Sequence, residues 1–187
     1  MADLLRGGAV GYLTLGCRLI IAGIFLVSLG SKVRGRAQYR EFVAATTALT
    51  GARAPYARCL AGLTVAAEGA VALLTALPQT ALAGLLLAVG VLSVFTYALV
   101  RVLRRDRVVT CRCFGSSTTP VGVPQVVRNV VLILTAVTGL VAGSGGISHV
   151  DVGGVAVTAF AAVICVLLLA RLDDLVELFR PTIHKGR

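Results

Sequence analysis

Two cysteines separated by a single residue, Cys111 and Cys113, lie in a polar, arginine-rich connection between two apolar segments. Thiols two residues apart point to opposite sides of an extended strand, but a tight turn can bring the sulfurs close enough to bond, at some cost in strain. A strained disulfide is more easily reduced than a relaxed one. Arg112 lies between the thiols and an apolar helix is expected to start near Val126, so positive charge and a helix dipole would favour the thiolates. The pattern predicts a redox-capable pair.

The alternative is that the cysteines are structural. Cys17, Cys59 and Cys165 fall within apolar segments, where cysteine commonly acts as a small hydrophobic residue. This interpretation suits Cys111 and Cys113 less well, because a polar turn offers no core to fill. A zinc site is disfavoured, since a structural zinc needs four ligands and the chain has no second paired-ligand motif. We therefore expect neither a metal nor a cofactor.

The composition argues against a soluble domain. The chain has 187 residues, of which 57% are hydrophobic and 14% charged. Its net charge of +10 comes from Lys and Arg in short connections beside apolar segments, which is typical of membrane topology rather than nucleic-acid binding. The sequence predicts an all-α, polytopic transmembrane helix bundle within the lipid bilayer. Its expected spans are residues 8–31, 55–77, 80–103, 125–142 and 150–170.

The connections between the spans have their own patterns. Residues 32–58 are basic and place Tyr39, Phe42, Val43 and Thr46 at helical spacing, which predicts a short amphipathic helix in the membrane interface. The tail over residues 172–179 has a similar apolar face and predicts a second interfacial helix. The corner at 78–79 is so short that the second and third spans must form an antiparallel hairpin. The first span has no cleavage site and is expected to be retained.

Two charged residues fall within the expected spans. Arg18 lies in the first span and Glu68 in the second, and each would be unfavourable alone in hydrocarbon. Counting from Lys32 as the inner end of the first span, and from Pro55 to Arg58 as the start of the second, gives Arg18 a depth of about 21 Å and Glu68 a similar depth of about 15–20 Å. We therefore expect an intramembrane ion pair between Arg18 and Glu68. Such a pair could simply hold the bundle together, or it could take part in proton movement or substrate contact.

The distribution of basic residues predicts the orientation. The first-to-second connection, the third-to-fourth connection and the tail are rich in Lys and Arg, whereas the opposite side holds only Arg6. With five spans, the three basic segments fall on one side, which is expected to be cytoplasmic. The N-terminus is then outside, and the Cys111–Cys113 turn and the C-terminus are cytoplasmic.

Several of these features resemble one family of membrane proteins, the methylamine utilisation MauE family within the wider DoxX-like group. The resemblance covers about residues 8–145, and its most specific part is Cys111-Arg112-Cys113-Phe114-Gly115. The weaker parts are Arg18 followed by Gly23-Ile24-Phe25-Leu26, Ser31-Lys32-Val33, Glu68 followed by Leu73-Leu74, and Arg128-Asn129.

The resemblance implies a four-span core in residues 1–145, with 146–187 adding a fifth span and an amphipathic tail. It also implies a partnership with a thioredoxin-like protein, in which Cys111 and Cys113 form the redox pair that assists maturation of the disulfide-rich small subunit of methylamine dehydrogenase. The fifth span departs from the four-span core, so the redox role transfers better than the client does.

Three functions remain open from the sequence. The leading hypothesis is a membrane thiol/disulfide exchange protein that acts with a soluble partner. Such a protein could be a component of a thiol/disulfide oxidoreductase. A second is a non-catalytic membrane subunit that anchors or assembles other proteins. A third is a small-solute transporter that uses Arg18 and Glu68, although the chain shows no inverted repeat or broken span.

Overall fold

The computed structural model describes residues 2–51, 53–104, 123–143 and 151–172, and within these ranges the structure is helical and contains no strand. Five helices within these ranges are long and apolar enough to cross a membrane, which confirms the all-α polytopic bundle. The elements are α1 (Ala2–Val33), α2 (Arg36–Thr50), α3 (Ala54–Ala76), the 3-10 turn η1 (Pro78–Thr80), α4 (Ala81–Leu103), α5 (Val123–Gly143) and α6 (Val152–Ala170).

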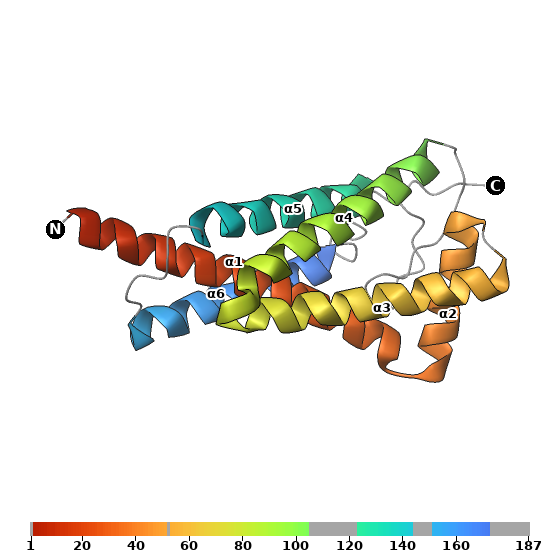
Figure 1. Cartoon of the computed structure of the whole chain (residues 1–187), viewed down its shortest axis with the longest axis horizontal. Helices are drawn as coiled ribbons and strands as arrows, with labels where there is room; N and C mark the ends of the chain where they lie inside the picture. The colour runs from red at the N-terminus through yellow and green to blue at the C-terminus, as the bar shows by residue number, and fades with distance from the viewer. Residues whose placement is uncertain (1, 52, 105–122, 144–150, 173–187) are drawn as a thin grey trace, which may run out of the picture.

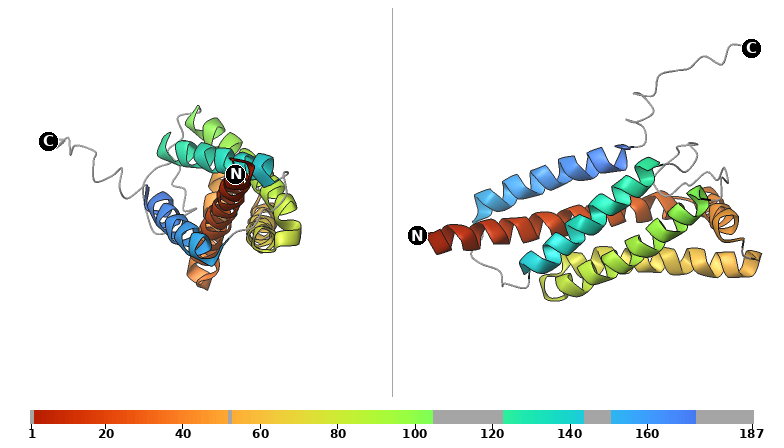
Figure 2. Two further views of the ribbon diagram at one scale, coloured as in Figure 1. Left: turned by 90° about the vertical axis from the view of Figure 1, so that its left-hand side faces the viewer. Right: turned by 90° about the horizontal axis from the view of Figure 1, so that it is seen from above.

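Helix α1 is the central element of the bundle. It contacts each of the five other α-helices, and Figure 2 shows them arranged around it when the bundle is viewed from the N-terminal end. The helices α3 and α4 cover one side, α5 packs on another, and α6 runs alongside α1 in the same direction. A side chain of α1 can therefore meet partners from several helices.

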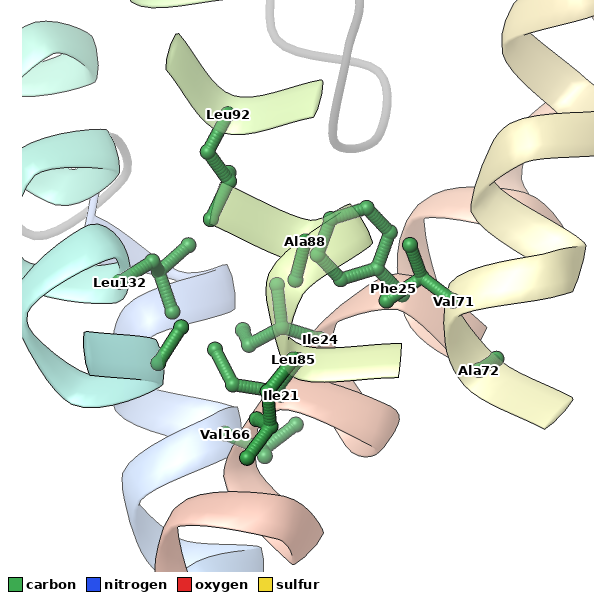
Figure 3. Packing of buried hydrophobic residues seen from close by; sticks show 11 residues of the cluster. Ile21, Ile24, Phe25, Val71, Ala72, Leu85, Ala88, Leu92, Leu132 and Val166 are labelled. Carbon is green, nitrogen blue, oxygen red and sulfur yellow. The ribbon is translucent and has the colours of Figure 1, made fainter. Parts of the chain in front are cut away.

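The apolar core lies where these helices cross. Figure 3 shows Ile21, Ile24 and Phe25 of α1 meeting side chains from four other helices. Those contributing side chains are Val71 and Ala72 of α3, Leu85, Ala88 and Leu92 of α4, Leu132 and Ala136 of α5, and Val166 of α6. Many large apolar side chains outside this cluster are exposed, such as Leu86, Leu134 and Phe160. This distribution suits a bundle whose outer surface is solvated by lipid.

The helices α3 and α4 form the antiparallel hairpin expected from the short corner between them. Gly84 of α4 lies directly against Thr75 of α3: a Cβ at this position would be 2.6 Å from the Thr75 amide nitrogen. Such a distance leaves no room for a side chain, so the close crossing depends on glycine.

The start of α6 is tied to α1. Asp151 precedes α6 and accepts hydrogen bonds from the amides of Gly153 and Gly154, which is a standard N-cap arrangement. The Tyr12 hydroxyl also donates to Asp151, at 3.2 Å. Together these hydrogen bonds hold the pKa of the Asp151 carboxyl below its usual value. The two backbone amides contribute more to this shift than the Tyr12 hydroxyl.

The expected amphipathic helix exists as α2. It lies across one end of the bundle, nearly perpendicular to the spans in Figure 1, and packs against α3 and α1. Phe42 is its buried anchor, and Tyr39, Val43 and Thr46 are partly buried beside it. The helical spacing read from the sequence therefore marks the side of α2 that faces the bundle.

Two sequence predictions lie outside the described residues. Cys111 and Cys113 belong to the connection 105–122, and all but the first residue of the predicted tail helix belongs to 173–187. Both remain predictions.

We predict that Gly84→Ala destabilises the bundle by about 1–3 kcal/mol, because the new methyl group must displace the backbone of α3. The measurement is thermal unfolding in mild detergent, followed by circular dichroism. Gly90→Ala is the matched control in the same helix, since a Cβ there meets nothing within 4 Å. Equal unfolding temperatures for the two variants would contradict the close crossing at Gly84.

Candidate functional site: a buried polar layer

A buried ion pair joins α1 to α3. The ammonium of Lys32 lies 2.5 Å from Oε1 of Glu68, and each side chain is only 2% exposed. It is the one ion pair recorded between residues of the described ranges. Lys32 is in the last turn of α1 and Glu68 is well inside α3, so the pair forms where the end of one span meets the interior of another.

Two further side chains complete the surroundings of Lys32. The Ser28 hydroxyl, one turn earlier on α1, accepts a hydrogen bond from the Lys32 ammonium at 2.8 Å and donates to Glu68 Oε1 at 3.1 Å. The ring of Phe42 lies on the remaining side, with its centroid 4.9 Å from Nζ, which is within cation–π range. Residues from α1, α2 and α3 thus converge on one ammonium group.

This arrangement satisfies most of the needs of two buried charges. An isolated charge in a low-dielectric interior is strongly unfavourable, whereas a hydrogen-bonded pair offsets much of the desolvation penalty. The Lys32 ammonium has an acceptor in Ser28, a counter-charge in Glu68 and an aromatic face in Phe42. Within the described part of the chain, Oε2 of Glu68 has no hydrogen-bond partner. The carboxylate therefore retains one acceptor in the interior of the bundle.

The prediction of an ion pair between Arg18 and Glu68 is wrong. Glu68 pairs with Lys32, and the half-buried Arg18 instead donates to the backbone carbonyl oxygens of Thr75 and Ala76, at 3.1 and 3.3 Å. These carbonyls end α3, where the last turn of a helix lacks intrahelical donors and carries partial negative charge. Arg18 therefore caps α3 rather than neutralising a carboxylate.

The error came from the assumed depths. The predicted depths depend on Lys32 and Pro55 both lying at inner ends of spans, but Leu29 of α1 lies beside Gly69 of α3, so Lys32 is level with Glu68. Pro55 is thirteen residues before Glu68, or about 20 Å along the helix. Helix α3 thus extends well beyond the end of α1, and α2 occupies the space past that end.

Helix α5 adds polar groups at a similar depth. Its first two turns bury three polar side chains, Gln125, Arg128 and Asn129. Gly139 lies against Cys17 and Gly143 against Thr14, which defines an antiparallel register between α5 and α1. Continuing from Cys17 and Gly139 by eleven residues along each helix places Arg128 level with Ser28.

We name these six side chains the buried polar layer: Ser28, Lys32, Glu68, Gln125, Arg128 and Asn129. Among the described residues the other two buried polar side chains are threonines, Thr14 and Thr75, which donate to carbonyls of their own helices. Chemically, the layer supplies two cations, one carboxylate, a hydroxyl and two amides in an apolar setting. Buried ionisable groups of this kind in membrane bundles often mark functional positions.

The connection that carries the predicted redox residues leads into the helix that contributes part of this layer. Cys111 and Cys113 are outside the described residues, but the connection that carries them joins the end of α4 to the start of α5. The start of α5 is also the part that contributes Arg128 and Asn129 to the layer. The remaining cysteines are free thiols in the spans: Cys17 is buried, and Cys59 and Cys165 are exposed on the outer surface.

The family resemblance contains four of the six residues of the layer, Lys32, Glu68, Arg128 and Asn129, but the sequence did not predict that they are buried together. In the sequence, Lys32 marks the inner end of the first span and Arg128 adds to the basic third-to-fourth connection, and neither pattern indicates burial. The spacing of Ser28 and Lys32, four residues apart on one helix face, was the signal that could have indicated an inward-facing lysine. No group of three or more His, Cys, Asp or Glu side chains that could hold a metal occurs among the residues described here.

We predict that Glu68→Gln destabilises the folded bundle by about 3–5 kcal/mol, because it leaves the Lys32 ammonium buried without a counter-charge. Adding Lys32→Met should recover much of this loss, whereas adding Arg18→Gln should only add its own effect. A double-mutant cycle of unfolding in detergent measures both couplings. Coupling of Glu68 to Arg18 with none to Lys32 would contradict the observed pairing.

Comparison with known proteins agrees with this architecture. A family model described as "Methylamine utilisation protein MauE" matches residues 10–142. Searches of curated proteins and of solved structures returned no match. The matched segment covers more than half of the chain and includes every residue of the buried polar layer. The chain is therefore a multi-pass membrane protein that belongs to the MauE family, a family linked to methylamine utilisation.

Proposed function

We propose that this protein exchanges thiols and disulfides with a thioredoxin-like partner through Cys111 and Cys113, either for disulfide formation or for transfer of reducing equivalents, as in maturation of the methylamine dehydrogenase small subunit. The observation that carries this proposal is the Cys-x-Cys-Phe-Gly sequence in a chain of the MauE family. The connection holding it is polar, so these thiols have no evident role as core-filling residues.

The surroundings of that connection support thiolate chemistry. Its helical boundaries, the end of α4 and the start of α5, carry Arg101, Arg104 and Arg128. Arg112 lies between the two cysteines. Positive charge and the positive end of a helix dipole both lower the pKa of a thiol, and the thiolate is the nucleophile in exchange. The local charge therefore favours an attacking sulfur.

The exchange is balanced between the two proteins. One Cys thiolate of the pair attacks a sulfur of the partner's disulfide, that S–S bond breaks, and a mixed disulfide forms as the partner's other sulfur leaves as a thiolate. The second cysteine, after losing its proton, attacks the mixed disulfide and releases the partner as a dithiol. The pair is oxidised to a disulfide, the partner is reduced to a dithiol, and two electrons and two protons pass from the pair to the partner. The reverse sequence oxidises the partner.

In this proposal the buried polar layer has a positioning role. The Lys32–Glu68 pair fixes α1 against α3, and α1 in turn packs on α5, whose first turns follow the cysteine connection. The competing assignment, a non-catalytic membrane subunit that anchors other proteins, would need the same bundle but no reactive thiols. The two assignments differ in whether Cys111 and Cys113 react as a pair.

We further propose that the cysteine connection faces the cytoplasm. The end of the bundle at which α4 finishes and α5 starts also carries α2, with exposed Arg34 just before it and exposed Arg36 and Arg40 in its first turns. Basic residues near span ends are retained on the cytoplasmic side. Five spans then leave the N-terminus outside.

We predict that one of the two single variants, Cys111→Ser or Cys113→Ser, traps the thioredoxin-like partner as a mixed disulfide. This is the variant that retains the attacking thiol, because it has no resolving thiol to release the partner. A non-reducing gel with mass spectrometry of the adduct is the measurement. Cys59→Ser and Cys165→Ser are matched controls, since both remove an exposed thiol of a span. These controls should form no stable adduct.

The outcomes separate the two assignments. An adduct linked through Cys111 or Cys113 supports exchange. Full activity in client maturation by both single variants, with no adduct in either, would show that the pair does not react and would favour the anchoring subunit.

We predict that a membrane-impermeant maleimide added to intact cells leaves Cys111 and Cys113 unlabelled, whereas the same reagent labels them after the membrane is permeabilised. The reason is the basic end of the bundle, which is expected to remain in the cytoplasm. A variant with Cys17, Cys59 and Cys165 replaced by Ser restricts the label to the pair. Ready labelling in intact cells would reverse the orientation.

A further inference from the structure

An exposed cluster of arginines surrounds the end of the bundle that α2 crosses. It contains Arg34 just before α2, Arg36 and Arg40 in the first turns of α2, and Arg53 and Arg58 at the beginning of α3. We call these five residues the arginine belt. Within the described ranges none of their guanidinium groups forms an ion pair. The belt therefore presents unneutralised positive charge.

The fold places this charge at the level of a membrane surface. Helix α2 connects the end of one span to the start of the next and lies across them, so it cannot be far from the ends of the bundle's apolar region. Phe42 faces the bundle, whereas Arg36 and Arg40, four residues apart, share a different flank of α2 and are exposed. Helices with this division of charge and apolar side chains lie in the membrane interface.

Exposed apolar side chains lie directly next to the belt. Val33 is 56% exposed and precedes Arg34, and Tyr56 is 68% exposed between Arg53 and Arg58. On α3, Leu60 and Leu63 continue the apolar stripe begun by Tyr56. The surface thus changes from apolar to cationic within about one helical turn.

We propose that the arginine belt binds anionic phospholipids, with the guanidinium groups of Arg36 and Arg40 paired to phosphate oxygens of the headgroups. A guanidinium can donate two parallel hydrogen bonds to a phosphate, which a lysine cannot match. An acidic protein face would also meet the positive charge, but it would not cover apolar side chains that continue into the membrane span. A phospholipid offers a phosphate to the arginines and acyl chains to the exposed apolar side chains.

The experiment uses the full chain reconstituted in nanodiscs made of equal parts phosphatidylcholine and phosphatidylglycerol. Native mass spectrometry after detergent release counts the lipids of each kind that stay bound. We expect the wild type to retain phosphatidylglycerol preferentially, and Arg36→Gln with Arg40→Gln to reduce this preference by about tenfold per arginine, because each guanidinium loses charge-assisted hydrogen bonds to a phosphate. Arg36→Lys with Arg40→Lys should keep part of it, because the charge remains.

The matched control is Arg101→Gln with Arg104→Gln, which removes the same charge from exposed positions at the end of α4. It should lose clearly less of the preference than the Arg36/Arg40 variant, because it weakens only the diffuse attraction to the anionic surface. Equal losses in the two double variants would indicate diffuse attraction and overturn a lipid site on α2. Displacement of the lipid by millimolar inorganic phosphate would indicate that the belt binds free anions. A wild type without preference for phosphatidylglycerol would indicate that the belt binds an acidic protein instead. Either result would overturn the proposal.

Discussion

The burial of the Lys32 ammonium is the constraint on which the rest of the bundle depends. A charge that is 2% exposed needs a counter-charge and hydrogen-bond acceptors at defined positions, and Glu68 and Ser28 provide them. Apolar helices in lipid can slide and rotate against each other with small energetic differences, because lipid tails are as apolar as the side chains. The ion pair removes that freedom between α1 and α3. Phe42, stacked on the same ammonium, then fixes α2 at the end of the bundle.

This constraint reaches the functional end of the protein through α1. The helix contacts every other α-helix, so its position relative to α3 also sets where α5 begins. The buried polar layer lies near the start of α5, and the connection that carries Cys111 and Cys113 leads into this helix. We therefore assign separate tasks to two groups of residues. The layer holds the helices in register, and the proposed chemistry belongs to the two thiols.

The sequence predicted the larger features of the fold well and the pairing of the charges poorly. Long apolar segments predict spans directly, and the spacing of Phe42 and its neighbours predicts an amphipathic helix, because both depend only on local pattern. Which carboxylate meets which cation depends on the relative depth of two helices. That depth could not be read from the chain, since α3 begins about 20 Å beyond the level of Lys32. Arg18, taken for a partner of Glu68, caps the end of α3 instead.

The central claim is that Cys111 and Cys113 form one reversible redox couple, and an equilibrium redox titration tests it most directly. The purified chain, with Cys17, Cys59 and Cys165 replaced by Ser, is equilibrated in glutathione or dithiothreitol buffers of increasing potential and then alkylated. Intact mass spectrometry counts the alkylated thiols. We expect both thiols to disappear together in a single two-electron step, with the loss of two hydrogens per chain. Two thiols that remain reduced across the whole range, or that oxidise independently of each other, would contradict the account.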